Sequence, residues 1–163
     1  NKIPFLGICL GMQMAVIEYA RNVKKIRYAN STEISEKCKD PVIDLMTSQK
    51  EIINKGGTMR LGAWDCEIEK NTKSYKSYKK KLISERHRHR YEFNNSYSDK
   101  IFDDKFIVAG SNPDTKLVEI VENIDHPWFV GVQFHPEYKS SVYNPHPIFV
   151  NFVKASLKKY LNK

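Results

Sequence analysis

A cysteine stands between two glycines at the point where a short apolar run gives way to helix-forming residues. The apolar run covers Ile3 to Ile8, and its end is included in the motif Gly7-Ile8-Cys9-Leu10-Gly11. Residues Met12 to Arg21 favour a helix. An apolar run without alternation is typical of a buried strand in a parallel sheet. The segment therefore predicts a strand, a tight turn that carries Cys9, and a helix.

This arrangement has the form of a nucleophile elbow. The chain reverses so sharply at the nucleophile that neighbours two positions away have to lack side chains, as Gly7 and Gly11 do. Cys9 would then lie at a helix N-terminus, where free N–H groups and the helix dipole favour a thiolate. We expect the N–H of Leu10 to hold an oxyanion at the same place. A structural cysteine between two incidental glycines stays open on this motif alone.

A histidine and a glutamate follow a strand-like segment near the other end of the chain. The motif Gln133-Phe134-His135-Pro136-Glu137 comes after Trp128 to Val132. In extended chain, residues two apart point to the same side, so His135 and Glu137 are expected to face together. A carboxylate beside a histidine fixes its tautomer and supports the imidazolium, as in a catalytic triad. Each residue alone also suits a solvated surface, and the combination with the Cys9 elbow favours catalysis.

The remaining segments predict an α/β fold in a single domain, residues 1–163, with an antiparallel portion in the second half. Strands are expected at 42–46, 63–69, 106–109, 117–121 and 128–134, the last two joined as a hairpin. The segment 48–57 is predicted to be a loop, and the lysine-rich segment 71–81 a surface loop or a short exposed helix. A final helix should bury one face, made by Ile148, Phe149, Phe152, Val153 and Leu157.

Composition excludes several classes of function. The chain of 163 residues is long enough for one hydrophobic core, and it has no apolar run near the length that spans a membrane. The net charge of +8 is interpreted as a solvated basic surface and not as a nucleic-acid site. Cys9, Cys38 and Cys66 have neither zinc-ligand nor disulfide-framework spacing, so no metal site is expected, and a reducing, cytoplasmic setting is favoured.

Taken together, the two motifs resemble those of the class I (triad) glutamine amidotransferases. Five stretches over nearly the whole chain are similar to the glutaminase domain of the CTP synthase family, and the third and fourth are the more specific. These stretches are Pro4 to Gln13, Ala29-Asn30-Ser31-Thr32-Glu33, Gly56-Gly57-Thr58-Met59-Arg60-Leu61-Gly62, Glu85-Arg86-His87-Arg88-His89-Arg90-Tyr91-Glu92 and His126-Pro127-Trp128-Phe129.

The resemblance implies a fold and a reaction. The fold is a mostly parallel central sheet flanked by helices, with an antiparallel C-terminal portion. In the reaction, the Cys9 thiolate attacks the side-chain amide of L-glutamine, His135 protonates the ammonia, and water hydrolyses the thioester. In the family, a synthetase domain of the same polypeptide uses the ammonia to convert ATP-activated UTP to CTP. No cofactor is implied for this domain; ATP, UTP, magnesium and the effector GTP belong to the full-length enzyme, which is a homotetramer in the family.

The resemblance also implies where glutamine binds. Glu33 suits the α-ammonium, and the planar guanidinium of Arg90 suits the α-carboxylate. A glycine-rich segment before the elbow supplies a second oxyanion donor in the family. Because the sequence starts at Asn1, we expect that segment and the N-terminal part of the fold to be missing, and the fragment to be inactive alone. The family's glutamine contacts fall on Leu10, Gly11, Met12, Gln13, Glu33 and Arg90.

Two rival functions stay open. One is another class I amidotransferase, such as that of GMP synthetase, against which the stretch 86–92 argues. The other is a non-catalytic basic binding module, since Arg86, Arg88 and Arg90 alternate along one strand and on their own suggest a phosphate or nucleic-acid patch.

Overall fold

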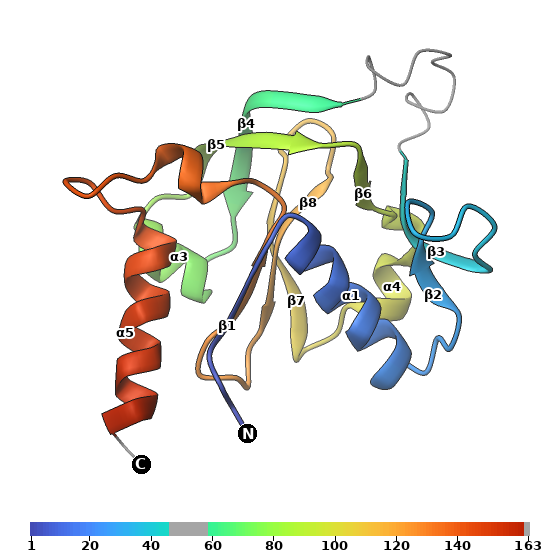
Figure 1. The fold of residues 1–163 in the computed structure, drawn as a ribbon, viewed down its shortest axis with the longest axis horizontal. Helices are drawn as coiled ribbons and strands as arrows, with labels where there is room; N and C mark the ends of the chain where they lie inside the picture. Colours follow the sequence, from blue (N-terminus) through green and yellow to red (C-terminus); the bar gives the residue numbers. More distant parts are fainter. Residues whose placement is uncertain (46–58, 162–163) are drawn as a thin grey trace.

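A six-stranded sheet forms the centre of the molecule (Figure 1). The computed structural model describes residues 1–45 and 59–161. Strands β1 and β9 pair in parallel, and every other neighbouring pair in this sheet is antiparallel. The strand order is β1 (Phe5–Ile8), β9 (Phe129–Val132), β8 (Val118–Asn123), β7 (Phe106–Ser111), β4 (Arg60–Ile68) and β5 (Leu82–His89).

The sheet is thus mixed, and the expectation of a mostly parallel sheet is wrong for the described residues. The reason lies in the connections, because β7, β8 and β9 follow one another through short turns, which allow only antiparallel pairing. The hairpin predicted for the last two strands is confirmed, with Val121 opposite Gly131.

A second, three-stranded sheet lies beside the first. Its order is β2 (Ala29–Ser31), β3 (Asp40–Leu45) and β6 (Tyr91–Phe93), with β2 parallel and β6 antiparallel to β3. Only Arg90 separates β5 from β6, so this residue lies where the chain passes from one sheet to the other. The strand predicted at 42–46 is confirmed as far as Leu45. The predicted loop 48–57 and the residues Gly56 to Thr58 of the glycine-rich motif lie outside the described residues.

Helices cover both faces of the six-stranded sheet (Figure 1). Helix α1 (Leu10–Asn22), the short α4 (Ser98–Ile101) and the small sheet lie on one side, and α3 (Lys73–Tyr78) and α5 (Pro147–Leu161) lie on the other. Two 3-10 helices, η2 (Asn95–Tyr97) and η3 (Pro136–Lys139), complete the fold. On β8, Val121 belongs to the core on the α1 side and Ile120 to the core on the α5 side. Burial of both faces explains the apolar runs that do not alternate.

The buried face of α5 differs from the predicted one. Ile148 is fully buried, and Phe152 and Ala155 pack against the same core. Val153 and Leu157 are 51% and 54% exposed, so the prediction that they share the buried face is wrong. Spacings of four and seven residues from Ile148 follow one helical stripe, whereas Val153 and Leu157 are turned well away from it.

The lysine-rich segment forms the short helix α3, and one of its residues is firmly anchored. Ser74 is fully buried, and the Glu122 carboxylate accepts hydrogen bonds from the backbone N–H groups of Lys73 (2.8 Å) and Ser74 (2.7 Å). A carboxylate from β8 therefore satisfies the free N–H groups at the start of this helix.

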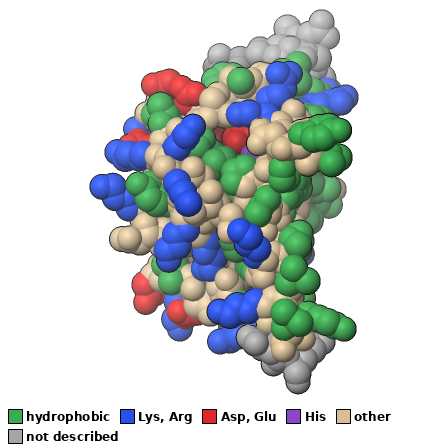
Figure 2. Space-filling view, turned by 90° about the vertical axis from the view of Figure 1, so that its left-hand side faces the viewer, with side chains coloured by type: hydrophobic (Ala, Val, Ile, Leu, Met, Phe, Trp, Pro, Cys, Tyr) green, Lys and Arg blue, Asp and Glu red, His purple; other side chains and the backbone are tan. Residues whose placement is uncertain are grey.

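Lysine and arginine side chains are spread over the side of the molecule on which α5 lies. Figure 2 shows them separated by hydrophobic and uncharged side chains. No helix within residues 1–45 or 59–161 has the length and apolar character needed to cross a membrane.

Candidate active site

Cys9 occupies a sharp turn between β1 and α1. Its backbone has φ 50° and ψ −105°, a left-handed conformation that side-chain-bearing residues rarely adopt. Its N–H donates to the carbonyl of Val132 (2.8 Å), and its carbonyl accepts from the N–H groups of Met12 (3.1 Å) and Gln13 (3.2 Å). Strand pairing holds one side of the turn and the first helical turn holds the other. The predicted strand–elbow–helix geometry is confirmed.

The two elbow glycines have different environments. A Cβ on Gly7 would lie 2.7 Å from the carbonyl carbon and oxygen of Gly11, so no side chain fits there. A Cβ on Gly11 would meet no atom of another described residue within 4 Å. The steric requirement predicted from the sequence is confirmed for Gly7 and is wrong for Gly11. Its missing side chain leaves open space beside the turn.

Burial determines the resting state of the Cys9 thiol. Desolvation raises its pKa, the hydrogen bond from the Leu10 backbone N–H opposes that effect, and the charges of Glu33 and Glu137 add to it. The helix N-terminus was expected to favour the thiolate, but burial has the larger effect on the pKa. The protonated thiol is the resting form, and a base is needed to activate it.

His135 and Glu137 form a hydrogen-bonded pair. The distance from His135 Nδ1 to Glu137 Oε1 is 2.6 Å, and the imidazole stacks on the Tyr138 ring with centroids 5.1 Å apart. Glu137 lies in η3, so a 3-10 turn brings the two side chains together and the expected extended backbone is wrong. His135 Nε2 is buried and accepts or donates no hydrogen bond within the described part of the chain. With Nδ1 held by the carboxylate, Nε2 is left available for proton transfer.

The strand order brings the cysteine and the histidine to the same edge of the sheet. Ile8 at the end of β1 is in register with Val132 at the end of β9, and the two strands are parallel. Cys9 and His135 therefore both follow the carboxyl ends of neighbouring parallel strands. In α/β proteins this edge is where binding sites form.

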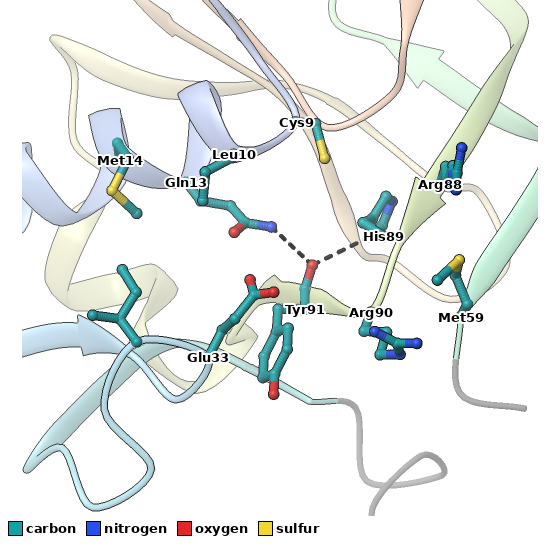
Figure 3. A pocket seen from close by; sticks show the side chains of 11 residues that line it. Cys9, Leu10, Gln13, Met14, Glu33, Met59, Arg88, His89, Arg90 and Tyr91 are labelled. Atoms are coloured by element: carbon teal, nitrogen blue, oxygen red, sulfur yellow. Dashed lines mark hydrogen bonds between the residues drawn. The ribbon is translucent and has the colours of Figure 1, made fainter. Parts of the chain in front are cut away.

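A pocket of about 350 Å³ opens beside Cys9 (Figure 3). Four of the six predicted substrate-binding residues line it, namely Leu10, Gln13, Glu33 and Arg90. Gly11 does not line it, and the Met12 side chain is fully buried in the core beneath β9. In Figure 3, Glu33 and Arg90 lie on opposite sides of Tyr91, with Cys9 above them. The other lining residues are Met14, Ile34, Met59, Arg88, His89 and Tyr91.

A buried charged cluster supports one wall of this pocket. Arg60 bonds the carboxylates of Glu119 (2.6 Å) and Glu92 (3.3 Å). His87 Nδ1 lies 2.8 Å from His89 Nε2. Burial and the charge of Arg60 lower the pKa of His87 to about 2 and that of His89 to about 3, so both imidazoles are neutral at pH 7. His87 and His89 belong to β5, and the residue that follows this strand is Arg90.

The alternating arginines and histidines of β5 point to opposite sides of the sheet. Arg86 and Arg88 are exposed, and His87 and His89 are buried, as the strand period requires. The alternation was visible in the sequence. The sequence does not show which of the two sets faces inward. That depends on residues of other strands, because His87 lies beside Glu119, which in turn bonds Arg60.

His146 is buried, although it stands between Pro145 and Pro147. It is 3% exposed, and its Nε2 lies 3.0 Å from Glu85 Oε1, which also accepts a hydrogen bond from the Tyr78 hydroxyl (2.9 Å). Lys139, at the end of η3, donates to the carbonyl of Ser84 (2.5 Å). This bond, with that from the His135 N–H to the Arg86 carbonyl (2.8 Å), fastens η3, and with it Glu137, to β5.

Residues 1–155 match the family model described as Glutamine amidotransferase class-I. The chain belongs to this family. It is 62% identical over 157 residues to the CTP synthase of Flavobacterium johnsoniae, an alignment that covers 96% of this chain and 29% of that protein. It is 61% identical over 156 residues to the CTP synthase of Christiangramia forsetii, with coverage of 96% and 29%. The chain thus spans less than a third of the length of these relatives.

Solved structures agree with this assignment. The glutaminase domain of Trypanosoma brucei CTPS with bound acivicin has a TM-score of 0.89 and 39% sequence identity, covering 97% of this chain and 61% of that one. A putative GMP synthase protein from Thermoplasma acidophilum has a TM-score of 0.63 at 19% identity, covering 100% and 63%, which supports the shared fold alone. The class I glutamine amidotransferase fold expected from the sequence is confirmed.

Proposed function

We propose that this chain is the glutaminase part of a CTP synthase. It hydrolyses L-glutamine at Cys9 and supplies ammonia for the ATP-dependent amination of UTP to CTP, a step of pyrimidine nucleotide biosynthesis. The observation that carries the proposal is the pocket in which Cys9 on its elbow faces Glu33 and Arg90. The identity of 62% to a CTP synthase supports the choice of acceptor reaction.

The pocket suits free glutamine because it offers one charge of each sign. Glu33 binds the α-ammonium, and the Arg90 guanidinium binds the α-carboxylate. The side-chain amide then extends towards Cys9, beside the Leu10 N–H. A substrate within a peptide chain would lack both terminal charges, so this pocket favours the free amino acid.

The reaction uses the groups at the carboxyl ends of β1 and β9. His135 takes the proton of the Cys9 thiol, and the sulfur attacks the amide carbon of glutamine. The Leu10 N–H stabilises the oxyanion. The C–N bond breaks as His135 returns the proton to the departing ammonia, leaving a glutamyl thioester. Water, deprotonated by His135, then hydrolyses the thioester to glutamate, while Glu137 holds the imidazole through Nδ1.

The synthetase reaction belongs to the rest of the polypeptide. We place the ATP, UTP and magnesium sites there, and leave GTP activation, the homotetramer and a cytoplasmic location as predictions from the family. The described residues include no group of three His, Cys, Asp or Glu side chains that could hold a metal ion. That nucleic acid is not a partner also stays a prediction.

The test is replacement of Cys9 by Ala in the complete polypeptide. Glutamine-dependent CTP formation should be lost, and ammonia-dependent formation should persist, because ammonia bypasses the thioester. Loss of both would contradict the assigned role. Offering XMP in place of UTP separates the GMP synthetase alternative. If the chain were a basic binding module, neither the parent protein nor the Cys9→Ala variant would release glutamate from glutamine.

A further inference from the structure

Gln133 is a buried polar residue that the proposed reaction does not use. Its side chain is fully buried, and its backbone N–H donates to the Glu119 carbonyl (2.8 Å), which fixes the chain at this point. A carboxamide in such a place requires partners for its oxygen and its nitrogen. Those partners are Gln13 and Cys9.

The hydrogen-bonding pattern settles which end of the amide faces the sulfur. The Tyr91 carbonyl can only accept, so the atom of Gln13 that lies 2.9 Å from it is the donor Nε2 (Figure 3). The same Nε2 lies 3.2 Å from the side chain of Gln133, whose atom there has to be the acceptor Oε1. Gln133 therefore presents its Nε2–H group to Cys9 Sγ, at 3.7 Å. Inverting either amide would place two donors or two acceptors against each other.

We propose that Gln133 is a positioning residue that holds the Cys9 sulfur in place and favours its thiolate. The inference rests on the proposed function, because it takes Cys9 to be the nucleophile. A thiol is a weak acceptor and a thiolate a strong one, so an N–H donor aimed at the sulfur stabilises the charged form more than the neutral form. The Leu10 N–H already opposes the effect of burial on the pKa of this thiol. In the proposal, the Gln133 N–H acts in the same direction.

The two amides also join the nucleophile to the substrate pocket. They form a continuous chain from Cys9 Sγ through Gln133 and Gln13 to the carbonyl of Tyr91, which follows Arg90. Gln13 is 2% exposed and Gln133 is fully buried, so solvent does not compete for these bonds. The sulfur is in this way held at a fixed place relative to Tyr91, the first residue of β6 and the one after the arginine proposed to bind the carboxylate.

The test is the pH dependence of Cys9 alkylation by iodoacetamide in the complete polypeptide, followed by peptide mass spectrometry. Gln133→Met keeps the length of the side chain and removes the donor. We expect its Cys9 profile to move to higher pH by about one unit, which is about tenfold less thiolate at a given pH below the thiol pKa. Cys38, which is partly exposed, serves as an internal reference and should keep its profile.

Two further variants separate positioning from general loosening of the fold. Asn112→Ala removes another buried amide, one that bonds the Asp65 carbonyl and has no contact with Cys9. It should leave the Cys9 profile in place. Gln133→Glu keeps the acceptor for Gln13 and puts a carboxylate beside the sulfur. The like charge opposes the thiolate, so this variant should also move the profile to higher pH, and it provides a second test if the Met variant does not fold.

Steady-state kinetics give an independent readout. We expect Gln133→Met to lower kcat for glutamate release at neutral pH by about tenfold with a much smaller change in KM, because the substrate contacts remain. An unchanged Cys9 alkylation profile in both Gln133 variants, or an equal shift in Asn112→Ala, would overturn the inference. Because alkylation requires no glutamine turnover, this result is distinguishable from a failure of the proposed function.

Discussion

The elbow glycines offer a matched pair of substitutions with opposite expected effects. In Gly7→Ala, the new methyl carbon would lie 2.7 Å from the carbonyl group of Gly11 and 2.9 Å from the Met12 nitrogen. Ordinary contact begins at 3.4 Å, so the first turn of α1 has to move away from β1. It has little room, because Met12 is fully buried and Gln13 is 2% exposed. Overpacking of this kind costs about 2–3 kcal/mol in the free energy of unfolding.

Gly11→Ala is the control, because it adds the same atom on the helix side of the elbow, in open space. Alanine is favoured over glycine within a helix, so we expect stability within about 1 kcal/mol of the parent, on the stabilising side. Urea unfolding of the complete polypeptide, with hydrogen exchange followed in the peptides of β1 and α1, measures both variants. If Gly7→Ala and Gly11→Ala unfold at the same urea concentration, the close approach of strand and helix at the elbow is refuted.

Three other substitutions test the buried charged cluster, the contacts of Asp103 with Lys24 and Tyr19, and the pocket. Arg60→Met leaves Glu92 and Glu119 buried without a cation and should cost about 3 kcal/mol in urea unfolding, and adding Glu119→Gln should recover part of the loss. Asp103→Asn should destabilise by about 1 kcal/mol, since hydrogen bonds from Lys24 (2.7 Å) and from the Tyr19 hydroxyl (2.9 Å) lower the pKa of Asp103 below its usual 3.8. Because the folded-state pKa is the lower one, this difference should be constant above about pH 5 and shrink as pH falls further, and thermal melts at several pH values measure it. Arg90→Lys should raise KM for glutamine about tenfold with a smaller change in kcat, because an ammonium cannot replace the planar fork.

The pattern of neighbouring residues in the sequence was enough to predict the elbow at Cys9. The apolar run, the glycine spacing and the helix formers all lie within about twenty residues, and each constrains the backbone near Cys9 directly. The pairing of His135 with Glu137 was also predicted correctly, although for a wrong reason. Pro136 starts a 3-10 turn, and a turn brings residues two apart together as effectively as the expected strand does.

The contacts that tune Cys9 could not be predicted, because they depend on strand order. Gln133 reaches the sulfur only because β1 and β9 are neighbours in register, although their residues are more than a hundred positions apart. In the same way, the inward set on β5 is defined by Glu119 of β8 and Arg60 of β4. For the same reason, the sequence predicted a lowered pKa for the Cys9 thiol, whereas the fold raises it. Burial is a property of the assembled fold, and it outweighs the local effect of the helix N-terminus.

The central claim is that Cys9 is the nucleophile for glutamine, and covalent labelling tests it most directly. The complete polypeptide is treated with an electrophilic glutamine analogue and the modified peptide is identified by mass spectrometry. We expect one adduct, on Cys9, that L-glutamine suppresses in proportion to its concentration. Cys38 and the fully buried Cys66 are internal controls and should stay unmodified. An adduct on either of them, or labelling of Cys9 that glutamine does not suppress, would contradict the account.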